Sequence, residues 1–211
     1  MSAAAGAVID ARNGQAARRE HILDAAEACF VRNGFHRTTM QDLAREASMS
    51  PGNIYRYFDS KEAVVLGLAE RDRERGAVLV EAMERAGDKR AMLMCVLARF
   101  FHDITREAAI LRLDVWAEAT RNPDIGAMGE GGDEDGRTWL IEMFDAIKTS
   151  ADCNPAALFD AVAPLMKGII VSRALNADYD AGPAVAQLQA AIDAGLSGAL
   201  PLPRRDQETG R

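Results

Sequence analysis

The sequence predicts an all-α protein of about nine helices, in which a three-helix N-terminal module precedes a larger helical domain. Three observations support this fold class. Apolar residues recur at the helical period along nearly the whole chain. No segment shows the convincing alternation of apolar and polar residues that a half-buried strand needs. Helix-start signals precede several of the periodic segments.

The first periodic segment follows an Ala- and Gly-rich stretch that has no pattern. We predict that residues 1–16 form a flexible tail and that a helix spans about 17–33. Gly34 then stands where a helix usually stops. The apolar face of this helix consists of Ile22, Ala26, Cys29 and Phe30.

Two short helices come next. Thr39 and Asp42 have the spacing of a capping box, in which each residue satisfies a free backbone N–H of the other, and this helix is expected to end near residue 47. After a turn at 48–50, Ser50 followed by Pro51 is a strong start signal for a second short helix. This second helix is expected to end near Phe58.

The rest of the chain is assigned from the same signals. Asp59 and Glu62 are expected to cap a long helix that reaches about residue 84. The glycine-rich acidic stretch 126–136 is predicted to be a flexible loop. Further helices are predicted over about 91–106, 107–121, 137–151, 155–176 and 183–199, and residues 201–211 are predicted to be a flexible tail.

Charge is distributed unevenly along the chain. The net charge is -7, yet residues 1–62 hold eight basic and eight acidic residues, so all of the acidity lies in the remaining part. A phosphate-binding surface therefore belongs in the N-terminal module if it exists at all. Three widely spaced cysteines favour free thiols in a reducing compartment. No signal peptide is recognised, and the apolar run 92–98 is too short to span a bilayer, so we expect a cytoplasmic protein without a membrane partner.

Residues 39–58 have the properties of a helix-turn-helix. Two short helices meet across a three-residue turn, and small residues at 44 and 47 let them cross closely. The inward-facing residues are expected to be Leu43, Ala44, Ala47, Ile54 and Phe58. The second helix then exposes small, hydroxyl, amide and guanidinium groups, which are the types that contact phosphates and base edges.

A family resemblance rests on these residues. The runs Thr38-Thr39, Leu43-Ala44 and Ser50-Pro-Gly-Asn-Ile-Tyr-Arg-Tyr-Phe58, followed by Ser60-Lys-Glu-Ala63, resemble the DNA-binding module of TetR/AcrR-family regulators over about 17–65. Beyond that segment, only the all-helical pattern agrees. The resemblance implies a DNA-binding domain at 17–62 and an effector-binding and dimerisation domain at 63–200. It implies DNA contacts by Thr39, Gln41, Ser50, Pro51, Gly52, Asn53, Tyr55, Arg56, Tyr57 and Lys61.

Two residues depart from the family pattern. Arg56 replaces an aromatic residue and either reaches a base or binds phosphate. Ser48 stands where glycine is usual, so its backbone is expected in the left-handed region. Several contacts have an ordinary structural alternative. The tyrosines at 55 and 57 can be packing residues, and Arg12, Arg18 and Arg19 are either an arm toward DNA or solvated charges.

The resemblance also implies a two-fold dimer and an effector chamber. The predicted dimer surface consists of two apolar stripes, with the alternative that both face their own core: Leu158, Val162, Leu165, Met166 and Ile169, and then Val185, Leu188, Ile192 and Leu196. The predicted chamber is lined by Met92, Phe100, His102, Arg112, Trp116, Trp139, Met143 and Met166. Arg112 and Asp114 lie two apart on one helix, so at most one of them faces the chamber.

These observations favour a repressor that a small hydrophobic or amphipathic effector releases from a palindromic operator. The alternative is an architectural DNA-binding protein without an effector, and a helical enzyme that has acquired the module ranks third. No HExxH, GxSxG or P-loop motif is present, and Asp133-Glu134-Asp135 does not fit an EF-hand, so we expect neither catalysis nor a metal or cofactor.

Overall fold

The computed structural model describes residues 2–85 and 87–201, and this part of the chain contains helices and no strand. The all-α fold class predicted from the sequence is therefore confirmed. The helices are α1 (Ser2–Asn33), α2 (Met40–Glu46), α3 (Pro51–Tyr55), α4 (Lys61–Glu84), α5 (Lys89–Asp103), α6 (Arg106–Ala119), α7 (Pro123–Ile147), α8 (Pro155–Leu175) and α9 (Gly182–Leu196).

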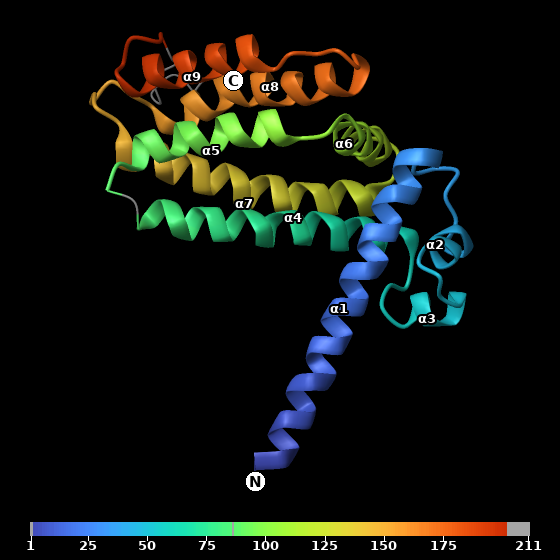
Figure 1. Cartoon of the computed structure of the whole chain (residues 1–211). Helices are drawn as coiled ribbons and strands as arrows, with labels where there is room; N and C mark the ends of the chain where they lie inside the picture. The colour runs from blue at the N-terminus through green and yellow to red at the C-terminus, as the bar shows by residue number, and fades with distance from the viewer. Residues whose placement is uncertain (1, 86, 202–211) are drawn as a thin grey trace.

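The chain has two packing units (Figure 1). The N-terminal module consists of α1, α2, α3 and the first turns of α4, and it encloses its own apolar core. The helical body consists of the rest of α4 and helices α5 to α9. Within it, α8 packs against α6, α7 and α9 around a second core. Helix α6 contacts both α1 and α8, so it joins the two units.

Side-chain caps fix where several of the helices begin. The hydroxyls of Thr39 and Ser50 accept hydrogen bonds from the N–H groups of Asp42 and Asn53, which confirms both predicted start signals. The start predicted at Asp59 and Glu62 is corrected. There, the hydroxyl of Ser60 accepts the hydrogen bond, from the Ala63 N–H at 3.1 Å.

The predicted N-terminal tail is helical. Residues 2–16 continue α1 rather than forming a tail, and this part of α1 projects away from the rest of the chain (Figure 1). The segment is rich in alanine and lacks proline, so the packed part of α1 can propagate through it. The other predicted tail, 201–211, lies outside the described residues after 201.

The predicted acidic loop at 126–136 is wrong, because α7 runs unbroken through it. The helix is held at both ends. Ile125 is buried in the module core, whereas Met143 and Phe144 are buried in the body core. A Cβ at Gly126 would lie 3.2 Å from the carbonyl oxygen of Ala119, so glycine permits a close approach to the end of α6. Packing at the two ends offsets the helix-breaking cost of the glycines, about 1 kcal/mol each.

The predicted dimer stripes face the interior of their own chain. The side chains of Leu158, Val162, Ile169, Val185, Leu188, Ile192 and Leu196 are between 0% and 3% exposed and belong to the body core. The prediction is therefore wrong for these seven residues, because amphipathic spacing marks a buried face without showing what buries it. Met166 is partly buried against the same core, and only Leu165 is exposed.

Helix α8 is both long and apolar. Among the described residues it alone is long and apolar enough to cross a membrane by length and composition, with a mean hydropathy of 1.4. Its packing against α6, α7 and α9 accounts for one side of the helix. The outward side retains exposed apolar residues, notably Leu165 and Leu175.

Candidate nucleic-acid interface

The segment between α2 and α3 has the predicted helix-turn-helix geometry. The Met49 N–H donates to the carbonyl of Ala44 at 2.8 Å, closing the end of α2 around the turn. Ser48 has a φ of 52°, the only positive φ of a non-glycine residue in the described part of the chain. The predicted left-handed conformation at Ser48 is confirmed, and it reverses the chain direction between the two helices.

The inner face of the helix-turn-helix is as predicted. Leu43, Ala44, Ala47, Ile54 and Phe58 are at most 4% exposed and pack in the module core. Two further residues that the sequence analysis missed complete the packing. His21 on α1 hydrogen-bonds the free carbonyl of Ala47 through Nε2 at 2.9 Å. A Cβ at Gly67 on α4 would lie 2.7 Å from the Phe58 ring, so only glycine allows this crossing.

The outer face of α2 and α3 exposes polar donors. Gln41, Asn53 and Arg56 are exposed, and no hydrogen-bond or ion-pair partner of their side chains is found in the described part of the chain. Tyr55 is half exposed at 50%, although its neighbour Ile54 is fully buried. An exposed phenol, amide and guanidinium on adjacent turns can donate hydrogen bonds to phosphates or base edges. Ser50, Pro51 and Gly52 are also exposed beside them.

Three predicted contact residues make contacts within the module. The Thr39 hydroxyl donates to the Asp42 carboxylate at 2.6 Å and accepts from the Asp42 N–H, so its proton is committed to the cap. This hydrogen bond from the hydroxyl lowers the pKa of the Asp42 carboxyl below its ordinary value. Tyr57 is partly buried against the module core. The Lys61 ammonium donates to the carbonyls of Phe35 at 2.8 Å and His36 at 3.5 Å.

Ion pairs sort the charges of the module. Arg19 pairs with Glu70 at 2.6 Å. Arg32 and Arg45 likewise pair with Glu46 and Asp42. Arg18, Arg37 and Arg56 are the exposed cations left without a partner in the described part of the module, so the electrically neutral module still presents positive charge. Arg37 was missed by the sequence analysis, and the side chain of Arg12 lies outside the described residues.

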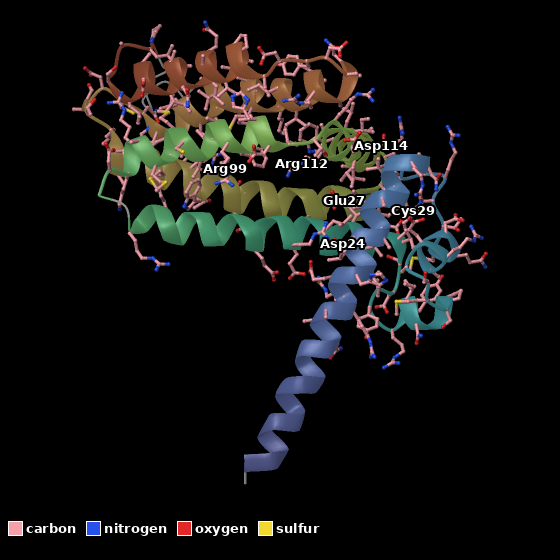
Figure 2. All side chains as sticks on the ribbon, in the orientation of Figure 1. Asp24, Glu27, Cys29, Arg99, Arg112 and Asp114 are labelled. Carbon is pink, nitrogen blue, oxygen red and sulfur yellow. The ribbon has the colours of Figure 1, made fainter. Side chains whose placement is uncertain are left out.

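The acidic residues of α1 lie on the side that faces α4. Arg71 on α4 is 3% exposed and pairs with Asp24 at 2.8 Å and with Glu27 at 2.5 Å. Figure 2 shows Asp24 and Glu27 on the part of α1 beside α4. A buried guanidinium shared by three carboxylates of α1, Glu20 at 3.9 Å being the third, ties the helices together and keeps these negative charges off the exposed face of α3.

The predicted chamber residues fall into two groups. Phe100 is 41% exposed and His102 is exposed, so these two lie on the surface of the chain and do not line an interior chamber. Both are on α5. The other six are closer to the interior: Met143 is buried, and Met92, Arg112, Trp116, Trp139 and Met166 are partly buried. The Arg112 guanidinium lies 5.1 Å from the centre of the Phe100 ring.

Two family models match the chain. Residues 22–68 match the model described as bacterial regulatory proteins, tetR family, and residues 89–197 match the C-terminal domain of BetI-type transcriptional repressors. The second match covers more than half of the chain, and the first covers the helix-turn-helix described above. The chain is a transcriptional regulator of the TetR family. The first match identifies the module as the N-terminal domain of this family, although these matches assign no contact to a single residue.

Individual relatives agree with this assignment. The regulator is 32% identical to the HTH-type transcriptional regulator UidR of Escherichia coli K12 over 111 residues, which are 52% of this chain and 56% of UidR. The match thus spans only about half the length of that curated relative. The fold resembles Salmonella enterica GusR with a TM-score of 0.69 and 25% identity, covering 85% of this chain and 94% of GusR. It also resembles Bacillus subtilis FadR, solved in complex with stearoyl-CoA, with a TM-score of 0.71, 18% identity, and coverage of 85% and 98%.

Proposed function

We propose that the regulator binds a palindromic DNA operator as a cytoplasmic homodimer, and that a small hydrophobic or amphipathic effector releases it. The observation that carries the DNA-binding part is the outer face of α3, where Asn53, Tyr55 and Arg56 are exposed donors beside a buried Ile54. A single α3 of five residues reads only a few base pairs. Two copies spaced by about one DNA turn, roughly 34–36 Å, would double the readout.

An exposed seam on α8 supports the dimer. Ala161, Leu165, Gly168 and Leu175 are spaced by four, three and seven residues, which places their side chains along one helix face. All four are exposed, Leu165 at 44% and Leu175 at 72%, and they lie beside the face whose residues enter the body core. Nothing lies within 4 Å of a Cβ at Gly168, so a second helix can approach closely. The occupant that fits is the same seam of a second copy, because a two-fold axis pairs a surface with itself.

Partly buried apolar side chains in the body support the effector. Trp116 and Trp139 are each less than fully buried while packing against the body core. Cations stack beside this region: Lys167 lies 5.9 Å from the Trp116 ring centre, and Arg112 stacks on Phe100. Such a mixture of apolar, aromatic and cationic side chains suits an amphipathic molecule. The complex of FadR with stearoyl-CoA shows that one regulator of this fold binds such a molecule.

The test is selection of DNA from a random duplex library by the purified regulator. The proposal predicts an enriched palindrome, bound by two protomers. Absence of any enriched sequence would contradict it. Small molecules that raise the melting temperature are then tested for release of the selected duplex. An effector must bind the DNA-free conformation more tightly to release DNA. Stabilisation without release by every binding molecule would favour an architectural role.

The dimer seam is tested separately. Leu165→Glu places a charge in the seam, so we expect a monomer in analytical ultracentrifugation. Its affinity for the selected duplex should be at least about a hundredfold weaker, because a monomer makes only half of the DNA contacts that a dimer makes. Phe100→Glu is the matched control, because Phe100 is exposed to a similar degree at 41% but lies outside the seam. A Leu165→Glu protein that remains dimeric would contradict the seam.

A further inference from the structure

The turn between α1 and α2 is hydrogen-bonded to side chains of α4 and α6. Gly34, with a φ of 78°, ends α1, and its carbonyl accepts the Thr38 hydroxyl at 2.8 Å. The next residue, Phe35, is held at both of its backbone groups. Its N–H donates to Asp114 on α6 at 3.3 Å, and its carbonyl accepts from Lys61, the first residue of α4, at 2.8 Å.

Side-chain contacts reinforce the same turn. The Lys61 ammonium also lies 4.2 Å from the centre of the Phe35 ring, and that ring packs in the module core. On the α6 side, His36 Nε2 lies 2.8 Å from the carboxylate of Glu118, one turn after Asp114. Figure 2 shows Asp114 where α6 meets the end of α1. Residues 34–36 therefore form a joint between α4, α6 and the module.

Resting on the proposed operator binding, we propose that Lys61 and Asp114 are positioning residues. They hydrogen-bond the carbonyl and the N–H of Phe35 and so fix the module at the angle that presents α3 to DNA. Lys61 then acts on DNA affinity without touching a phosphate. Its ammonium already binds two carbonyls and an aromatic face on the inner side of the turn. Asp114 acts from the body, and it is the first group through which a shift of α6 reaches the module.

A role as a negative charge alone and a positioning role for Asp114 predict opposite changes in DNA affinity on its removal. If Asp114 is only one more negative charge, its removal tightens DNA binding, because the body repels phosphates. If it positions the module, Asp114→Ala weakens binding by about tenfold, because the Phe35 N–H loses a charged acceptor. Asp114→Asn keeps an acceptor oxygen and should rescue the affinity. Glu107→Ala is the control for charge alone, since Glu107 is exposed in the first turn of α6.

Salt dependence separates positioning from phosphate contact at Lys61. Affinity for the duplex that the wild-type regulator selects from the random library is measured at several salt concentrations. We expect Lys61→Met, which keeps the aliphatic stem on Phe35, to weaken binding by about tenfold with the wild-type slope. Arg56→Met should instead lower the slope by about one, as loss of a phosphate contact does. The Lys61→Met and Asp114→Ala double variant should lose less than the product of the single losses, because both act on one joint.

Hydrogen exchange tests the joint in the DNA-free protein. Amides in residues 34–38 should exchange faster in Asp114→Ala and in Lys61→Met, with circular dichroism unchanged. A slope reduced by about one in Lys61→Met would identify a phosphate ligand and overturn the proposal, as would unchanged or tighter binding by Asp114→Ala. If the wild type selects no duplex, the proposed function fails. Exchange at 34–38 still decides, because unchanged protection in both variants would overturn the joint.

Discussion

The N-terminal module and the helical body bury their apolar residues to different degrees. Among the described residues, each core contains 17 buried apolar residues, but the body core has 17 further apolar residues packed against it while only partly buried, whereas the module core has six. The module thus buries most of its core apolar residues within the single chain. The body leaves apolar surface for a second copy or a ligand, as the exposed α8 seam illustrates.

The most direct way to break this comparison is to truncate one side chain in each unit. Ile54 is 0% exposed in the module, so Ile54→Ala should lower the free energy of unfolding by about 2–5 kcal/mol and abolish operator binding. Met166 is only partly buried in the body, and Met166→Ala should cost less, about 1 kcal/mol. Urea unfolding measures both losses. Equal losses would show that the body is packed as tightly as the module.

Two glycines sharpen the comparison. A Cβ at Gly67 in the module would lie 2.7 Å from the Phe58 ring and 3.0 Å from Leu23, so Gly67→Ala should destabilise by about 1–3 kcal/mol. Gly136 lies within α7 with nothing within 4 Å of the added Cβ, so Gly136→Ala should stabilise by about 0.5–1 kcal/mol through helix propensity. Thermal unfolding followed by circular dichroism distinguishes them. A neutral Gly136→Ala would favour the flexible loop that we predicted from sequence.

The smallest expected difference is in pH dependence. The Thr39 hydroxyl lowers the pKa of Asp42 in the folded module, so this contribution to stability is present above 3.8 and is lost as pH falls through the folded value. Burial raises the pKa of the Cys153 thiol in the body, so its contribution is present below 9.0 and is lost as pH rises toward the folded value. Asp42→Asn should flatten only the acid side of the melting-temperature profile, and Cys153→Ala only the alkaline side. A change on the opposite side for either variant would contradict the assignment.

Local signals in the sequence were sufficient for most of the module. The Thr39 capping box, the Ser50-Pro51 start and the left-handed Ser48 were all predicted, because each depends on residues within one or two turns. The role of Lys61 was not predictable. Its partners lie 25 and 26 residues away, and only the folded turn brings their carbonyls to the ammonium.

The body was less predictable for a related reason. An apolar stripe shows that a helix is covered, but the same stripe on α8 or α9 is compatible with its own core or with a partner. Leu158 and Leu188 proved to face their own core, which left Leu165 as the one exposed member of the predicted dimer surface. The glycines of 126–136 suggested a loop because the anchors of α7, at Ile125 and Phe144, act through tertiary contacts.

The central claim is that the exposed face of α3 reads DNA while its buried face only packs. Tyr55→Ala tests it most directly, because Tyr55 is 50% exposed and contributes little to the core. The account predicts about tenfold weaker binding to the selected duplex, with the urea midpoint and the affinity for random-sequence DNA nearly unchanged. Wild-type affinity for the selected duplex in a folded Tyr55→Ala protein would contradict the account.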